Sequence, residues 1–383
     1  MDVSPLSALS PEELTRTLIS FKSITPQDAG CLPFLQDILK GLGFAVILHE
    51  PKNPGGPKNL SAVYGTGQKT LVFLGHTDVV PEGDTTWEGF TPREENGFLF
   101  GRGVADMKGG IAAFIVTAAH FIQEYPSFPG KLVVLLTGDE EVGTPEGIQA
   151  LLPWAPEYYG PFTACLVGEP SSINTLGDHI AIGHRGSLNL HIKAQGIQGH
   201  VANPEQARNP IPILLKYLQK ITTYVWEPDP GDFAPSHLEI TSIDVGNPVS
   251  NIIPEQAQAY ANIRFHIQHS AQTVAQRLQD LATETSEHLS VETTANGEAF
   301  LCRDVSLIQI AESAVQEVLQ VTPTRGTGGG TTDGRFISPY CPVIEIGMVS
   351  RTIHHKNECI PLADCSRLTQ VYEAFLRNFF LRA

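Results

Sequence analysis

The stretch Leu71-Val72-Phe73-Leu74-Gly75-His76-Thr77-Asp78 joins an apolar run to two side chains of the kind that bind or orient a metal ion. The apolar run predicts a strand buried on both faces of a sheet. His76 and Asp78 follow where that strand ends, and their spacing of two points both side chains the same way. One could therefore ligate a metal while the other orients it. Taken alone, the pair is more often two polar residues in a surface turn than a metal site.

The same order, an apolar run and then a ligand-type residue, recurs along the chain. Leu132–Leu136 precedes the adjacent carboxylates Glu140 and Glu141, and Cys165–Val167 precedes Glu169. Each carboxylate has an ordinary alternative, since acidic turns are common on protein surfaces. In open α/β sheets, however, functional residues gather at the carboxyl ends of strands. The repetition at successive strand ends therefore favours one shared site.

Asp106 is the next candidate, between the segment Gly101–Ala105 and the segment Met107–Tyr125. The second segment is rich in Ala, Ile and Phe and predicts a buried helix, so a simple helix N-cap is the common role for an Asp placed there. With the imidazoles of His76 and His354, a different role becomes available. Two imidazoles, one shared Asp and one carboxylate per metal would make a pair of zinc sites that each keep an open position.

The sequence pattern changes after about His184. Apolar residues alternate with polar ones in Leu188–Ala194 and Ala259–Ile267, which predicts half-buried strands. With further strands near Leu238–Val245 and Val291, and helical stretches between and beyond them, the order is β-α-β-β-α-β. That order is typical of a split βαβ, ferredoxin-like α+β domain. We expect a domain of residues 184–296 inserted into an α/β domain of residues 1–183 and 297–383.

Composition limits the classes of function and partner. The chain has 383 residues, 42% of them hydrophobic, which is enough for more than one core. A net charge of −16 argues against nucleic acid as a partner. We expect no membrane partner, because no run of apolar residues approaches the roughly 20 that a membrane helix needs. Six scattered cysteines and no secretory signal favour the cytoplasm.

These motifs resemble the zinc aminoacylase/carboxypeptidase family of di-zinc amidohydrolases, and the likeness extends over nearly the whole chain. It is carried by His76–Asp78, by Ala105–Gly110 and by Asp139–Glu141. The resemblance implies an α/β, zinc-peptidase-like catalytic domain with a mixed central sheet flanked by helices, and an inserted dimerisation or lid domain. It also implies a homodimer with two Zn²⁺ per subunit, for which Co²⁺ can substitute.

The resemblance assigns the metal ligands position by position. Asp106 would bridge both zinc ions, His76 and Glu169 would complete one site, and Glu141 and His354 the other. His354 is preferred to the neighbouring His355 because it lies in the Thr-Ile-His register.

It also assigns the groups that act around the metals. Glu140 would be the general base, and Asp78 would support the first ligating imidazole. His200, in the segment Gly196–His200, matches a His that reaches the oxyanion from the small domain of the other subunit.

Further stretches, among them Gly328–Phe336 and Thr352–Glu358, resemble the branch of the family that hydrolyses the amide of an N-succinylated diamino acid. Such a small-molecule substrate carries several carboxylates, which Arg and amide groups suit. Ser250 departs from the branch, which has Asn there. A deacetylase or small-peptide carboxypeptidase of the family would share the zinc ligands, whereas a non-hydrolytic relative would be expected to lose Glu140. The residues matching substrate-binding positions are Arg185, Ser187, Asn251, Arg264 and Thr331.

Overall fold

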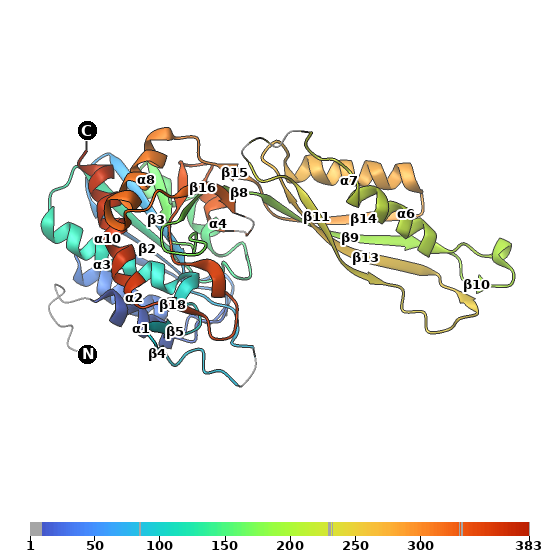
Figure 1. Ribbon diagram of the computed structural model, residues 1–383, viewed down its shortest axis with the longest axis horizontal. Helices are drawn as coiled ribbons and strands as arrows, with labels where there is room; N and C mark the ends of the chain where they lie inside the picture. Colours follow the sequence, from blue (N-terminus) through green and yellow to red (C-terminus); the bar gives the residue numbers. More distant parts are fainter. Residues whose placement is uncertain are drawn as a thin grey trace. The chain divides into compact units, whose positions relative to one another are not determined.

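The computed structural model describes residues 10–83, 86–228, 231, 233–328, 330 and 332–382, and these form two compact units (Figure 1). The first unit holds the chain up to Gly183, then Cys302–Gly326 and the residues from Thr332 onward. The second holds His184–Leu301 and a short segment that begins at Thr327. It thus runs past residue 296, the end we expected. Within the added residues, the Glu298 carboxylate accepts a hydrogen bond from the Ala271 backbone N–H, at 3.0 Å, inside the same unit.

A mixed sheet lies at the centre of the first unit, with strand order β1-β2-β6-β3-β7-β17-β8. Strands β6, β3, β7 and β17 run parallel, while β1, β2 and β8 pair antiparallel with their neighbours. The parallel strands are apolar and buried, as expected where helices cover both faces of a sheet. This confirms the predicted mixed sheet. The strands are β1 Ala45–His49, β2 Asn59–Gly65, β3 Lys69–His76, β6 Gly130–Thr137, β7 Ala164–Val167, β8 His179–His184, β16 Thr324–Gly328 and β17 Val343–Glu345.

Helices flank this sheet, and α3 is the most deeply buried of them. The first helix begins with Ser10 as its N-cap and Pro11 at its first position, and both residue types are favoured there. A short three-stranded sheet lies beside the helices and joins β18 to β5 and β4. The helices are α1 Pro11–Ser20, α2 Cys31–Gly41, α3 Gly109–Glu124, α4 Ile148–Leu151, α5 Ala155–Tyr159, α8 Val305–Leu319, α9 Gly334–Ile337 and α10 Ala363–Phe380, and the small strands are β4 Arg93–Glu95, β5 Phe98–Phe100 and β18 Cys359–Pro361.

One expectation about apolar length needs correction. Within the described chain, the segment Val104–Glu124 is long and apolar enough to cross a membrane by length and composition alone. Its polar members, Asp106 and Lys108, break the continuous apolar run, so counting consecutive residues missed it. Because 94% of its apolar window is buried inside the protein, the segment is a core helix with its preceding turn.

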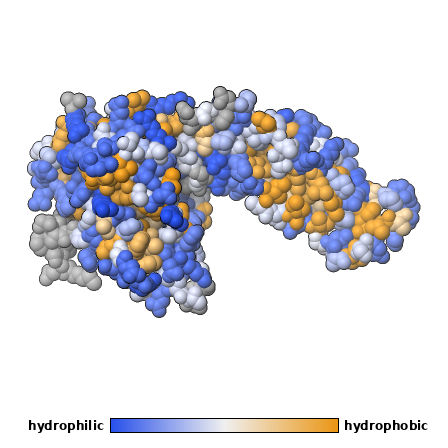
Figure 2. Space-filling model, in the orientation of Figure 1, coloured by the Kyte–Doolittle hydropathy of each residue, from blue (hydrophilic) through white to orange (hydrophobic). Residues whose placement is uncertain are grey.

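The second unit is an antiparallel sheet of order β11-β13-β9-β14 with two helices. Alternate residues of β13, such as Ala259 and Ile263, are buried, and those between them are more exposed. Together with the order along the chain, this confirms the predicted β-α-β-β-α-β layout. Figure 2 shows hydrophobic residues gathered on the visible surface of this unit. Its elements are β9 Gly186–Gln195, β10 Gly199–His200, α6 Pro210–Thr222, β11 His237–Asp244, β12 Ile252–Ile253, β13 Gln256–Phe265, α7 Ala271–Thr285, β14 Leu289–Gly297 and β15 Phe300–Leu301.

Candidate metal centre

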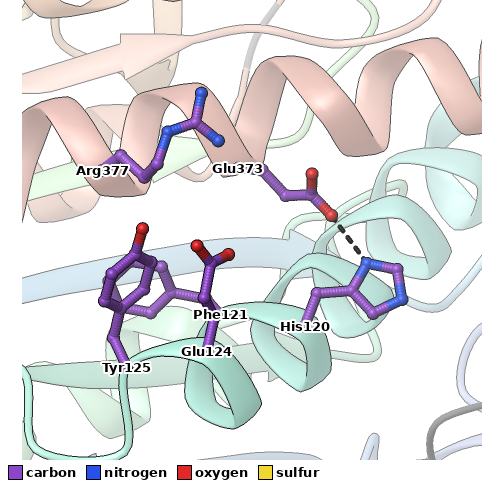
Figure 3. Close-up of a pocket in the computed structure, with 6 residues that line it drawn as sticks. All are labelled: His120, Phe121, Glu124, Tyr125, Glu373 and Arg377. Carbon is purple, nitrogen blue, oxygen red and sulfur yellow. Dashed lines mark hydrogen bonds and ion pairs between the residues drawn. The ribbon is translucent and has the colours of Figure 1, made fainter.

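A surface pocket of about 270 Å³ is lined by residues of α3 and α10, with Tyr125 just beyond α3 (Figure 3). The His120 ring lies 2.6 Å from the Glu373 carboxylate, and Arg377 bonds to Glu317 at 2.6 Å. Partly exposed ion pairs of this kind contribute little, because water screens them. His120 and Arg377 are thus each paired with a carboxylate, and we do not assign this pocket as the reactive centre.

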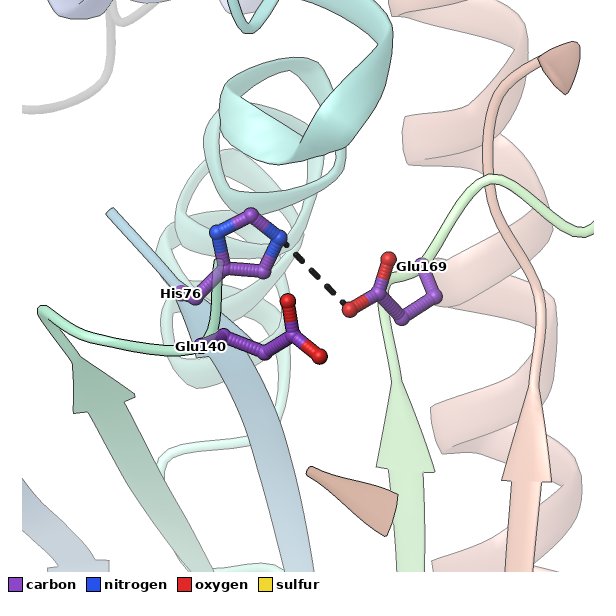
Figure 4. Close-up of side chains that lie close together, drawn as sticks. All are labelled: His76, Glu140 and Glu169. Carbon is purple, nitrogen blue, oxygen red and sulfur yellow. Dashed lines mark ion pairs between the residues drawn. The ribbon is translucent and has the colours of Figure 1, made fainter. Parts of the chain in front are cut away.

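A second group of titratable residues lies buried at the carboxyl ends of the parallel strands. His76 is the last residue of β3, Glu140 follows β6, and Glu169 follows β7. Because these strands are parallel neighbours, their ends meet at one edge of the sheet. The ligand atoms of the three side chains lie within 4.8 Å of one another, and Figure 4 shows the side chains converging. The arrangement predicted from the apolar runs is therefore present in the fold.

Asp106 lies between the two imidazoles. Its Oδ1 is 3.0 Å from His76 Nε2, and its Oδ2 is 3.3 Å from His354 Nε2. His354 Nε2 also lies 3.2 Å from Glu141 Oε1. The neighbouring His355 instead presents its backbone carbonyl to Arg102. The structure thus brings together all five residues that the resemblance assigned as ligands, with Asp106 in the middle.

The charges in this cluster shift the pKa of both histidines upward. Burial disfavours the charged form of His76, but the carboxylate of Glu169 and the hydrogen bond to Asp106 outweigh it and raise its pKa well above the usual value. Hydrogen bonds to Asp106 and Glu141 raise the pKa of His354 to about 10. Burial works against a low pKa for Asp106, yet the bonds from His354 and His76 hold it well below its usual range. The carboxylates of the cluster therefore stabilise positive charge placed among them.

Two further carboxylates of the cluster, Glu140 and Glu169, are destabilised as anions. Burial raises the pKa of Glu140 well above its usual value, and nearby carboxylates such as Asp333 add to the rise. Burial and the charge of Asp106 raise the pKa of Glu169 in the same way. Glu140 Oε1 is buried and has no hydrogen-bond partner among the described residues. A buried acceptor without a partner carries a desolvation penalty unless a cation or water satisfies it.

These observations fit a pair of metal ions. Two overlapping groups of ligand atoms, His76 with Glu140 and Glu169, and His76 with Asp106 and Glu141, are each close enough to hold one ion. Because both groups include His76, a second ion would take its imidazole from His354, which lies 3.3 Å from Asp106 and 3.2 Å from Glu141. Imidazole nitrogen and carboxylate oxygen are donors that suit divalent zinc and its neighbours in the first transition series. A bound cation would replace the positive charge that the protonated imidazoles supply.

A family comparison agrees with this geometry. The model of peptidase family M20/M25/M40 matches residues 72–378, a span that includes every residue of the cluster. The chain belongs to this family. M20 members generally depend on two metal ions, and one solved structural neighbour is described as a dinuclear metal binding peptidase.

Relatives within the M20 family cover nearly the whole chain. The succinyl-diaminopimelate desuccinylase of Paracoccus denitrificans is 39% identical over 378 residues, 97% of this chain and 98% of the relative. That of Gluconacetobacter diazotrophicus is 41% identical, covering 95% of this chain and 96% of its own length. Among solved structures, an aminopeptidase from Bacillus cereus shares the fold, with a TM-score of 0.81 at 20% identity over 97% of this chain and 99% of that one.

The metal centre of this M20 chain is supported by Asp78. Its backbone carbonyl lies 2.9 Å from His76 Nδ1, while its side-chain Oδ1 is 3.6 Å from the same nitrogen. The side chain instead accepts the backbone N–H groups of Glu140 and Glu141, each at 3.2 Å, and the Thr25 hydroxyl at 2.6 Å. Asp78 therefore orients the first imidazole mainly through its backbone and fixes the Glu140–Glu141 turn through its carboxylate.

Two substrate-binding candidates meet on the sheet of the second unit. Arg264 and Ser187 are cross-strand partners on β13 and β9. Asn262 links them, because its Oδ1 accepts from Arg264 Nε at 3.0 Å and its Nδ2 donates to Ser187 Oγ at 3.2 Å. Arg185 lies just before β9 and donates to the Pro235 carbonyl at 3.1 Å. The sequence singled out the Arg residues but gave no sign of the linking Asn.

Two further candidates lie on a separate two-stranded ribbon, β10 with β12. His200 is exposed on β10, and its Nδ1 accepts from the Ala202 N–H at 3.0 Å. The Asn251 carbonyl accepts from the Val201 N–H at 3.1 Å, which places both candidates at the same end of this ribbon. Thr331 lies outside the residues that the structure describes.

The cluster also contains groups that motif reasoning did not assign. Asp333 Oδ2 accepts from the Thr137 hydroxyl at 2.9 Å, and burial raises the pKa of Asp333 to about 6. Arg102 and Glu358 form an ion pair at 2.9 Å, and both are almost fully buried. Both residues lie in stretches already singled out by their sequence, Gly101–Ala105 and Thr352–Glu358, but nothing in the sequence indicated that they would pair.

Proposed function

We propose that this chain is a zinc-dependent hydrolase that cleaves the amide of N-succinyl-LL-2,6-diaminopimelate to succinate and LL-2,6-diaminopimelate, a step of bacterial lysine and diaminopimelate biosynthesis. The observation that carries the proposal is end-to-end similarity to succinyl-diaminopimelate desuccinylases at 39–41% identity. The buried cluster at the strand ends supports it, because amide hydrolysis needs a polarised carbonyl, an activated water and a proton for the leaving amine.

The chain's own residues would divide that work. Metal ions, when bound, acidify water and polarise a carbonyl group. Asp106, facing both imidazoles, would hold the two ions together. Glu140 is suited to move the proton, because its Oε1 is buried and has no other partner among the described side chains. It would take a proton from the attacking water and return it to the departing amine nitrogen.

Zinc is our choice for both ions, with cobalt as a substitute. In this division, each half of the cluster offers one imidazole, one carboxylate of its own and a share of Asp106. Zinc takes this nitrogen and oxygen set and tolerates four or five ligands, which leaves a position for substrate. Magnesium and calcium prefer sites made only of oxygen.

Selection of the succinyl group is assigned to the second unit. The substrate's succinyl carboxylate needs a cation or several hydrogen-bond donors, and Arg264 is our first candidate because a guanidinium binds carboxylate in a two-pronged fashion. Its Nε is already oriented by Asn262. Arg185, Ser187, Asn251 and Thr331 are assigned to the remaining polar groups of this small-molecule substrate.

We also propose a homodimer that forms through the second unit. Strand β11 lies at an edge of its sheet, where it can pair with another chain. Leu215 on α6 and Ile243 on β11 are 52% and 50% exposed, although both are large and hydrophobic. Such side chains on an open edge favour a partner of the same kind. Cytoplasmic localisation, without nucleic acid or membrane partners, completes the proposal.

If His200 acts in the other subunit's site, two inactive variants should complement each other. Chains carrying His200→Ala, mixed with chains carrying Glu140→Gln, would give mixed dimers with one intact site each. Activity should reappear after subunit exchange, which differently tagged chains would verify. Verified exchange without any recovery of activity would contradict action across subunits.

The substrate assignment is tested by offering the zinc-loaded protein N-succinyl-LL-2,6-diaminopimelate and N-acetylornithine side by side. We expect the succinylated substrate to be hydrolysed with the higher kcat/KM, and Glu140→Gln to serve as the metal-retaining control without turnover. Preference for N-acetylornithine would contradict the desuccinylase proposal and favour a deacetylase of the same family.

A further inference from the structure

The carboxylate of Glu358, which is buried and is not one of the proposed ligands, accepts hydrogen bonds from the turn that carries Asp106. Glu358 Oε1 accepts the backbone N–H groups of Ala105 and Asp106, at 3.0 and 3.3 Å. Its Oε2 accepts the Gly103 N–H at 3.0 Å and Arg102 Nη1 at 2.9 Å. The Glu358 side chain is 1% exposed, and that of Arg102 is 2% exposed. Four donors therefore meet two oxygens in a place from which bulk water is absent.

The turn that Glu358 contacts has irregular backbone angles, and its own backbone does not supply acceptors for all of its N–H groups. Asp106 and Met107 depart from helical backbone angles within Val104–Lys108. The amides of Gly103, Ala105 and Asp106 also lie at the start of this segment, where a helix provides no partners for its first N–H groups, and a buried amide without a partner is costly. The Glu358 carboxylate supplies those partners. All four contacts come from N–H donors, so the site fits the anionic carboxylate and leaves no acceptor for a carboxyl proton.

The same carboxylate belongs to the segment that carries His354. Glu358 follows His354 by four residues, and Arg102 also donates to the His355 carbonyl at 3.3 Å. The Gly101 N–H donates to the Glu358 carbonyl at 3.0 Å. Strand β18, which starts at the next residue, pairs with β5. Two chain segments more than 250 positions apart are thus joined beside the candidate centre.

We propose that Glu358, with Arg102, is a positioning residue that sets the distance between Asp106 and His354, and so tunes how tightly the second metal is held. The inference rests on the metal centre of the proposed function but not on the identity of the substrate. Glu358 touches no ligand side chain. It acts through the backbone of Asp106 on one side and through its own segment on the other.

The test is metal binding by Glu358→Gln, measured without substrate. The amide keeps the shape of the side chain but turns an N–H₂ group toward backbone N–H donors, which breaks at least one contact. Groups that orient metal ligands typically change metal affinity roughly 10- to 100-fold. We expect a loss of that size for one of the two ions in chelator-competition titrations with Zn²⁺, and altered visible absorption of the Co²⁺-loaded protein.

Glu227→Gln provides a matched control. Glu227 is another buried carboxylate, in the second unit, where it accepts from the Ser236 N–H and pairs with His269. Its loss should lower thermal stability while metal affinity and the Co²⁺ spectrum stay at wild-type values. A Glu358→Gln protein that behaves like this control, less stable but with unchanged binding of both ions, would overturn the proposal.

Glu358→Asp keeps the test decisive should the Gln variant not fold. It preserves the charge but withdraws the oxygens by about one carbon–carbon bond, so we expect a smaller loss of metal affinity in the same direction. Wild-type affinity for both ions in the folded Asp variant would equally overturn the proposal. Because no substrate is present, a wrong desuccinylase assignment would leave both results unchanged.

Discussion

The two units place their functional residues in opposite environments. In the first, most of the cluster is buried: the side chains of His76 and Asp106 are 1% and 11% exposed, whereas that of His354 is 49% exposed. In the second, His200 and Asn251 are exposed, and Arg264 is only partly buried on an open sheet face. Charges in a buried site interact strongly, whereas exposed charges are screened. The comparison teaches that the first unit supplies reactivity through coupled charges, and the second can supply selectivity through separate contacts.

The largest effect is expected at the buried site, from Glu140→Gln. The amide has nearly the same shape but cannot take a proton from water. Loss of a general base costs on the order of 10² to 10⁴ in rate. We therefore expect kcat to fall by this factor while the protein keeps its metal, as steady-state kinetics and elemental analysis together would determine. A variant that retains more than about a tenth of wild-type kcat would place the base elsewhere.

Removing metal should increase hydrogen exchange in the first unit and leave exchange in the second unit unchanged. An ion that binds only the folded protein stabilises it by about 2.7 kcal/mol when present at about a hundred times its Kd. Treatment with a chelator leaves the carboxylates of the first unit without that charge, so amides around Asp106 and Glu140 should exchange hydrogen faster. Amides of β9 and β13 serve as the internal control, because their strands form a separate core. Equal loss of protection in both units would contradict this division.

The contrast also explains how much the sequence could predict. His76, Glu141 and Glu169 follow apolar strands, and parallel strands end at the same edge of a sheet, so the strand pattern predicted that these three would meet. Asp106 and His354 follow no such strand, and their place in the cluster came from the family resemblance. The period-two alternation in Leu188–Ala194 likewise predicted the second sheet. Both predictions rest on backbone periodicities that hold wherever one or both faces are buried.

Contacts between distant segments were beyond the reach of sequence patterns. Nothing in the spacing of Glu358 indicates that its carboxylate would accept amides from Gly103–Asp106, because that pairing depends on how β18 docks on β5. Asn262 was hidden for a related reason. On an alternating strand, an Asn on the more exposed face looks like any surface residue until its cross-strand neighbours are known.

Arg264→Ala, a change in the second unit, should have an intermediate effect on kcat/KM. Losing a charge-assisted hydrogen bond to a carboxylate costs about 1.5–3 kcal/mol, or about ten- to a hundredfold in kcat/KM for the succinylated substrate. Arg264→Lys should recover only part of it, because an ammonium cannot reproduce the planar fork. Metal content should not change. Lys193→Ala, which removes another cation of the same sheet, is the control and should leave kcat/KM unchanged. If Arg264→Ala lowers kcat/KM by less than about twofold, Arg264 is not the carboxylate clamp.

The smallest effect should come from Asn262, which touches Arg264 but carries no charge. Its Oδ1 accepts from Arg264 Nε at 3.0 Å, so Asn262→Ala removes one contact that orients the guanidinium. A neutral hydrogen bond is worth about 0.5–1.5 kcal/mol, which predicts a roughly two- to tenfold rise in KM for the succinylated substrate with kcat unchanged. Asn262→Asp should be worse than Ala, because its carboxylate would compete with the substrate for the same guanidinium. Asn189→Ala, which removes an amide that bonds Asn262 at 2.7 Å, is the matched control. Kinetics that rank the Asp variant equal to or better than the Ala variant would show that Asn262 does not act through Arg264.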